Sequence, residues 1–157
     1  MKIKLIVVGK TNAKYLIEAE KEYQQRLKHY INFEEIIISD IKKTKKLTHT
    51  ELSIREGELV ISKIENNDVV VLLDDKGTQF SSVDFSDFIN QKMLYSTRSL
   101  VFIVGGAFGF SNEVYERADA KLSMSKMTFS HQMVRMIFKE QLYRAFTILK
   151  GEKYHHE

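Results

Sequence analysis

Four short runs of apolar residues recur along the chain, and each has the length and composition of a buried β-strand. They are rich in Val, Ile and Leu, and they occupy residues 2–8, 33–39, 69–73 and 100–104. Between them, apolar residues repeat at the spacing of an amphipathic helix. These helical segments cover residues 12–30, 50–64 and approximately 82–94. The pattern therefore predicts strands that alternate with helices.

The last helix is predicted most clearly, because it has both a start signal and a stop signal. Ser130 is a favourable N-cap residue, and apolar residues follow at helical spacing as far as Leu149. Gly151 then supplies the residue type that commonly ends a helix. His131 falls in the first turn, where it is either a polar residue that fills a helix start or a catalytic or substrate-binding group.

Strands that are apolar on both faces are typical of a parallel sheet covered by helices on each side, so the predicted fold class is α/β. The chain has 157 residues, no proline and no Gly/Ser-rich linker, and it is predicted to be one domain, residues 1–157. Only four apolar residues follow Lys4 before Gly9. That run is too short for a membrane span or a secretory signal, and it predicts a first strand.

Composition narrows the class of protein. Hydrophobic residues make up 43% and charged residues 29%, which indicates a folded chain rather than a disordered one. Cysteine is absent and the histidines show no ligand spacing, so we expect no disulfide and no metal site, and a reducing cytoplasm is compatible. The net charge of +3 is compatible with a polyanionic partner. Four lysines within residues 42–46 predict a solvated surface loop or, alternatively, a phosphate-contacting loop.

The main chemical signal lies where the fourth apolar run ends. Gly105, Gly106 and Gly109 follow it directly, and such a loop exposes main-chain amides and lets the backbone approach a ligand closely. A dinucleotide-binding oxidoreductase is disfavoured, because the order Gly-x-Gly-x-x-Gly is absent. The methionines are predicted to fill the core or an interface rather than to bind a ligand. The four concerned are Met124, Met127, Met133 and Met136.

Five segments match one known family in their order and spacing. They are Lys-Ile-x-x-x-x-Val-Gly-Lys at residues 2–10, Leu73-Asp74 with Gly77, Ile103-Val104-Gly105-Gly106 with Gly109, Leu-Ser-x-Ser-Lys-Met-Thr-Phe at residues 122–129, and the tail with Tyr154 and His155. On these residues the chain resembles, from end to end, the ribosomal RNA large subunit methyltransferase H family, which belongs to the knotted SPOUT class of methyltransferases. Ser130 departs from this family, which usually has a proline there.

The resemblance implies a fold and a cofactor. The fold is a mostly parallel sheet flanked by helices, with a deep C-terminal trefoil knot, a topology that proteins otherwise avoid and that periodicity does not reveal. The cofactor is S-adenosyl-L-methionine, and no metal is implied. The cofactor-binding residues that it implies are Leu73, Gly105, Met124, Ser125, Lys126, Met127, Thr128 and Phe129.

The resemblance also implies a substrate and partners. Members of the family methylate N3 of a pseudouridine in the helix 69 loop of 23S rRNA, and they act on assembled ribosomes in the cytoplasm as homodimers. For this reaction His131 is the candidate base, and Arg135 is the candidate to hold a phosphate or the developing charge on an imide oxygen. Tyr154 and His155 are expected to reach the target base.

The dimer is expected to pair through the last helix, burying Val134, Ile137 and Phe138 and setting one tail beside the partner's cofactor pocket. The alternative function is a non-catalytic ribosome-binding factor that keeps a vestigial pocket. Cofactor binding distinguishes the two functions.

Overall fold

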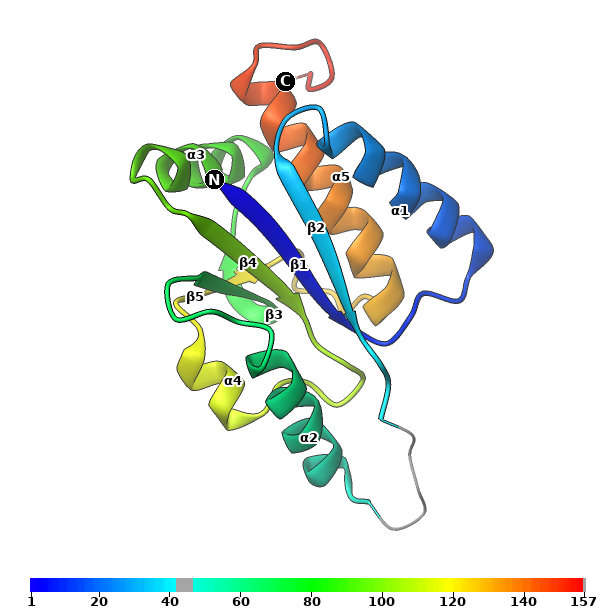
Figure 1. Ribbon diagram of the computed structural model, residues 1–157. Helices are drawn as coiled ribbons and strands as arrows, with labels where there is room; N and C mark the ends of the chain where they lie inside the picture. The colour runs from blue at the N-terminus through cyan, green and yellow to red at the C-terminus, as the bar shows by residue number, and fades with distance from the viewer. Residues whose placement is uncertain (42–46, 157) are drawn as a thin grey trace.

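The computed structural model describes residues 1–41 and 47–156, and its centre is a five-stranded sheet in which all strand pairs are parallel (Figure 1). The strands lie in the order β2-β1-β4-β3-β5. Their bounds are β1 Lys2–Val8, β2 Asn32–Ile38, β3 Val69–Gln79, β4 Ser99–Val104 and β5 Ala120–Ser123. The helices are α1 Lys14–Leu27, α2 His49–Ile61, α3 Ser82–Leu94, α4 Asn112–Arg117 and α5 His131–Leu149.

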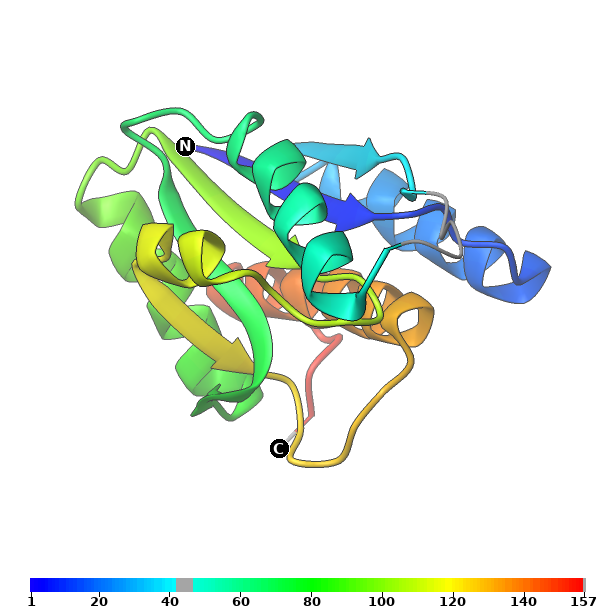
Figure 2. The ribbon, with the colours of Figure 1, turned by 90° about the horizontal axis from the view of Figure 1, so that it is seen from below.

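Helices cover both faces of the sheet (Figures 1 and 2). α1, α3 and α5 pack on one face, and α2 and α4 pack on the other. Successive side chains of a strand point to opposite faces, so each strand contributes to two cores. In β1, Ile3 and Leu5 belong to the core beneath α1, α3 and α5, whereas Ile6 and Val8 belong to the other core. The predicted α/β class is confirmed.

The signals that bound the last helix are also confirmed. The main-chain N–H of Met133 donates to Ser130 Oγ over 3.2 Å, so Ser130 caps α5. Gly151 follows the helix with a φ of +66°, in the left-handed region that glycine tolerates best. The first helix is shorter at both ends than the predicted 12–30. The predicted lysine loop at 42–46 lies outside the described residues.

The hydrophobic pattern did not predict α4 or β5. It also predicted a third strand over residues 69–73 only, whereas β3 continues to Gln79. Two of the four residues of β5 are buried, which is too little for a recognisable alternation. The pairing of β3 with β5 is irregular between Leu73 and Thr78. Gly77 is needed within this irregularity, because a Cβ there would lie 2.7 Å from the backbone of Leu122. The close approach of two backbones is a property of the fold that strand periodicity does not contain.

Buried cations fasten α5 to its neighbours. Lys139 is 0% exposed, and its Nζ lies 2.6 Å from Glu20 Oε2 on α1 and 2.8 Å from Glu35 Oε1 on β2. One turn earlier, Arg135 is 1% exposed and donates to the carbonyl oxygens of Val8 and Gly9 at the end of β1. Two charged residues on the inner face of a helix contradict amphipathic patterning, so the sequence analysis did not predict that they are buried.

One of the three residues expected to be buried in the dimer, Phe138, is buried in the core of its own chain. Phe138 is 0% exposed, and the centroid of its ring lies 4.6 Å from that of Phe102 in the core of its own chain. The prediction that Phe138 is buried by dimer formation is therefore wrong, because the sheet already covers it. Val134 and Ile137 on the same helix are only partly buried.

Replacing Lys139 with alanine is expected to lower the free energy of unfolding by about 3–5 kcal/mol, because it leaves two carboxylates buried without their cation. Urea unfolding followed by circular dichroism measures the change. Lys21→Ala on the exposed face of α1 is the matched control and should stay within about 0.5 kcal/mol of the wild type. Equal stability of the two variants would contradict the anchoring role of Lys139.

Candidate functional site

A cavity of about 470 Å³ opens at the carboxyl edge of the sheet. Its walls come from Leu73 to Asp75 in β3, from the loop after β4, from the loop after β5 and from the first turn of α5. Open parallel sheets bind ligands beyond the carboxyl ends of their strands. The volume falls within the range of about 300–1,000 Å³ that is typical of small-molecule sites.

The structure brings the predicted cofactor residues together from three separate segments. All of them except Lys126 line the cavity: Leu73, Gly105, Met124, Ser125, Met127, Thr128 and Phe129. Lys126 belongs to the same loop but its exposed side chain does not line the cavity. His131 lies at the cavity wall as well. This places the candidate base beside the candidate cofactor site.

The loop after β4 forms a compact turn. The N–H of Gly109 donates to the carbonyl oxygen of Gly106 over 3.3 Å, and Gly109 has a φ of +76°, which disfavours other residues. A Cβ at Gly105 would lie 3.1 Å from the ring of Phe110. The loop thus presents a backbone surface to the cavity, as the glycine spacing predicts.

The loop after β5 is held by serine hydroxyls. Ser123 Oγ donates to the carbonyl oxygen of Ser125 over 3.0 Å, and the N–H of Met127 donates to Ser125 Oγ over 2.9 Å. Met127 itself is 78% exposed at the cavity rim, so of the two predicted places, the core or an interface, it does not occupy the core of its own chain. Met124, in contrast, packs against the core as predicted.

Two polar residues of the cavity wall, Asp74 and Tyr115, were not predicted as site residues, although Asp74 lies in one of the matching segments. Tyr115 on α4 donates its hydroxyl proton to Asp74 Oδ2 over 2.6 Å, across 41 positions of sequence. Burial alone would raise the pKa of Asp74, but the hydrogen bonds from Tyr115 and the Lys76 N–H outweigh burial and lower it. Burial and the Asp74 carboxylate raise the pKa of Tyr115 to about 12. At neutral pH the cavity therefore carries a charged carboxylate, which suits a cationic ligand.

Arg135 lies outside the lining of the cavity near which it was expected to act. Its guanidinium donates to the Gly9 carbonyl oxygen over 2.8 Å and to Thr11 Oγ1 over 3.3 Å, in addition to Val8, and it does not line the cavity. Its two terminal nitrogens are thus engaged inside the chain and Nε is buried without a partner among the described residues, so in this arrangement the guanidinium is not placed to hold a phosphate or an imide oxygen in the cavity.

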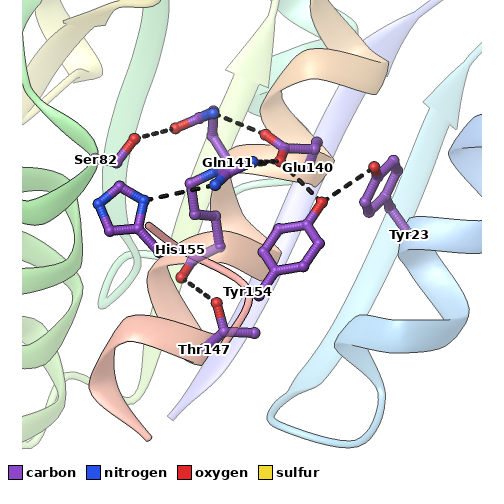
Figure 3. Close-up of polar contacts among 8 residues, drawn as sticks. Tyr23, Ser82, Glu140, Gln141, Thr147, Tyr154 and His155 are labelled. Atoms are coloured by element: carbon purple, nitrogen blue, oxygen red, sulfur yellow. Dashed lines mark hydrogen bonds and ion pairs between the residues drawn. The ribbon is translucent and has the colours of Figure 1, made fainter. Parts of the chain in front are cut away.

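The tail folds back on α5 (Figure 3). The Tyr154 hydroxyl lies 3.1 Å from Glu140 Oε1 and 3.3 Å from the Tyr23 hydroxyl. The guanidinium carbon of Arg144 lies 4.7 Å from the centroid of the Tyr154 ring, and Arg144 Nη1 lies 3.5 Å from His155 Nδ1. The two predicted tail residues are thus brought together, but neither lines the cavity of its own chain.

The tail and the cavity lie at opposite ends of α5. The helix starts at the cavity with His131, and Arg144 follows about 20 Å further along, at 1.5 Å per residue. Figure 1 shows the tail at the end of the sheet where the strands begin, whereas α5 starts at the other end. Tyr154 and His155 therefore do not reach the cavity within one chain in this arrangement.

Among residues 1–41 and 47–156, no group of three or more His, Cys, Asp or Glu side chains is arranged to hold a metal ion. Within the same ranges, no helix has both the length and the apolar character that crossing a membrane requires.

The fold and the cavity define an α/β protein with a small-molecule site built from backbone loops, and the similarities to known proteins give that site a chemical class. The family model described as "Predicted SPOUT methyltransferase" matches residues 1–155. A probable methylase family protein from Haemophilus influenzae shares the fold with a TM-score of 0.52 at 10% identity, over 97% of this chain and 67% of that chain.

Relatives named ribosomal RNA large subunit methyltransferase H match over full length. The protein from Christiangramia forsetii is 57% identical over 99% of each chain, and that from Parabacteroides distasonis is 54% identical over 100% of each chain. The chain belongs to the SPOUT methyltransferases and, among them, to the ribosomal RNA large subunit methyltransferase H family. The resemblance recognised in the sequence is confirmed.

Replacing Tyr115 with phenylalanine is expected to raise the pKa of Asp74, because the variant loses a donor that stabilises the carboxylate. NMR titration of the Asp74 side-chain carboxyl carbon measures the shift. Tyr95→Phe, at a tyrosine that is 82% exposed, is the matched control and should leave the titration of Asp74 in place. An unchanged pKa in the Tyr115 variant would contradict the role given to this hydrogen bond.

Proposed function

We propose that this protein uses S-adenosyl-L-methionine to methylate N3 of a pseudouridine in the helix 69 loop of 23S rRNA, acting on assembled ribosomes. The observation that carries the proposal is the convergence of the family's cofactor segments, from β3, from the loop after β4 and from the loop after β5, on one cavity. The printed names of the full-length relatives support rRNA of the large subunit as the substrate. A ribosomal substrate implies work in the cytoplasm.

The residues present fit this cofactor. Leu73, Val104 and Val134 give the cavity apolar walls, and the loop at Gly105 presents backbone groups for hydrogen bonding. The charged carboxylate of Asp74 offers a favourable electrostatic environment for a cation. When bound, S-adenosylmethionine supplies a methyl group on a positively charged sulfur that is already a good leaving group.

The remaining chemistry is the removal of one proton. Methylation at N3 of the pseudouridine would require that nitrogen to lose its proton, and a residue of this chain would have to take it up. His131, at the cavity wall, is the proposed proton acceptor. Tyr154 is unsuited to that role, because burial raises its pKa and keeps the phenol protonated at neutral pH. Its proposed role is to contact the target base.

A homodimer resolves the distance between tail and cavity. α1 and α5 lie side by side, and α1 exposes Tyr15 at 66% and Ile17 at 45%. Val134 and Ile137 of α5 are only partly buried within one chain. We propose that pairing through these helices sets the tail of one protomer beside the cavity of its partner, so that each site takes residues from both chains.

The trefoil knot of the family belongs to the same proposal. α4 lies on one face of the sheet and α5 on the other, so the chain passes from one face to the other between them, by way of β5 and the cavity loop (Figure 2). A knotted path through these segments would fix the cofactor loops against each other, which favours a pre-formed cavity.

Ribosomal subunits from a strain that lacks this enzyme should accept label from S-adenosylmethionine with a labelled methyl group. Mass spectrometry of rRNA fragments is expected to locate the label on the helix 69 pseudouridine of assembled ribosomes. Label at another nucleotide would contradict the proposed substrate. No label, despite measurable binding of the cofactor, would favour the non-catalytic ribosome-binding factor.

Two inactive variants should restore activity when mixed. His131→Ala removes the proposed base but keeps the tail, whereas deletion of residues 152–157 removes the tail but keeps His131. Random re-pairing is expected to recover about a quarter of wild-type activity, since half of the dimers are mixed and each holds one intact site. Methyl transfer to ribosomes measures the recovery. Full activity of the tail deletion alone, or no recovery in the mixture, would contradict a site shared between protomers.

A further inference from the structure

Glu56 is a buried carboxyl group that the proposed chemistry does not use. It lies on α2, is 9% exposed, and shares its surroundings with Val8, Val60 and Val114. Within the described part of the chain its Oε2 atom has no hydrogen-bond partner. Burying a polar group without a partner costs free energy, so the burial of Glu56 requires a reason.

The carboxyl group touches the glycine loop from behind. A Cβ placed on Gly106 would lie 2.5 Å from Glu56 Oε2, and its three nearest neighbours are all atoms of that carboxyl group. Gly106 also lines the main cavity on its other side, together with Gly105 and Gly109. The glycine loop is therefore a thin partition with Glu56 on one side and the candidate cofactor site on the other.

The space behind the loop is almost filled. A second cavity bounded by Glu56, Gly105, Gly106 and Ser111 has a volume of only about 10 Å³, which is room for no more than about one water molecule. The Glu56 side chain occupies the volume into which the loop would otherwise relax. Its burial and the nearby charge of Asp40 raise its pKa, so the neutral form is favoured relative to an exposed glutamate.

α2 contacts the same loop at a second point. The ring of His49, the first residue of α2, stacks on the ring of Phe108 with centroids 4.2 Å apart and planes at 25°. His49 and Glu56 are seven residues apart and so lie two turns apart on one face of the helix. One rigid element thus holds the glycine loop at Gly106 and at Phe108.

We infer that Glu56 is a positioning residue. It holds the backbone of Gly105 and Gly106 in the position that binding of S-adenosylmethionine requires. This inference rests on the proposed function, because it takes S-adenosylmethionine as the ligand of the main cavity. Glu56 acts through the backbone of Gly106 and has no direct contact with substrate. Its removal therefore changes affinity for the cofactor more than the methyl transfer rate at saturating cofactor.

Calorimetric titration of the full-length protein with S-adenosylmethionine tests this role. Glu56→Ala is expected to weaken binding by about tenfold, while the transfer rate at saturating cofactor stays within about twofold. Glu56→Gln keeps the shape of the side chain that fills the space behind the loop and should bind within about threefold of the wild type. Glu58→Ala, at an exposed glutamate on the same helix, is the matched control and should bind like the wild type.

A double-mutant cycle with Gly106→Ala shows whether Glu56 acts through the loop. Gly106 has no positive φ, so alanine is permitted by the backbone, but its methyl group meets the Glu56 carboxyl group. Gly106→Ala alone should weaken binding, and combining it with Glu56→Ala should cost less than the sum of the single changes. The single Gly106→Ala variant keeps the test available if Glu56→Ala does not fold.

Three results would overturn the inference: wild-type affinity in Glu56→Ala or in Gly106→Ala, binding by Glu56→Gln as weak as by Glu56→Ala, or strict additivity in the cycle. A wild-type protein that does not bind S-adenosylmethionine would instead refute the proposed cofactor. The two failures are therefore distinguishable in the same titration series.

Discussion

The structure depends on the anchoring of α5 by two buried cations. Lys139 bridges carboxylates of α1 and β2, and Arg135 ties the helix to the end of β1. Desolvated cations tolerate little displacement, because each must keep its partners at hydrogen-bonding distance. The position of α5 is therefore fixed along its axis and about it. His131 begins this helix and the tail follows its last residue. The same anchors therefore fix the position of the cavity wall at one end of α5 and of the residues that contact the tail at the other.

The cavity is built mostly from backbone, and this explains why its supports lie outside it. A glycine loop has no side chains with which to pack, so neighbouring elements must hold it in place. α2 does so from behind through Glu56 and His49, and the serine hydroxyls of residues 123–130 do so for the facing loop. Ser130 accepts a hydrogen bond from the N–H of Met133 and so caps α5 where that loop ends.

The sequence by itself determined the fold class, the single glycine loop and the family. Buried parallel strands and amphipathic helices leave strong local periodicities, and Ser130 and Gly151 mark the ends of α5 through local backbone chemistry. The predicted cofactor residues were identified from the resemblance, and in the structure all of these residues except Lys126 line one cavity. These features are predictable because each depends on neighbours in sequence or on a motif kept in order along the chain.

The tertiary structure decided what depends on contacts between distant segments. The pairing of Asp74 with Tyr115, the burial of Arg135 and Phe138, and the separation of the tail from its own cavity have no local signature. A buried arginine and a solvent-facing arginine occupy the same helical spacing, and only the carbonyl groups that meet the guanidinium distinguish them. The short β5 likewise exists because β3 offers it an edge. Local patterns fix which elements form, whereas packing fixes which polar groups lose water and thereby which of them act.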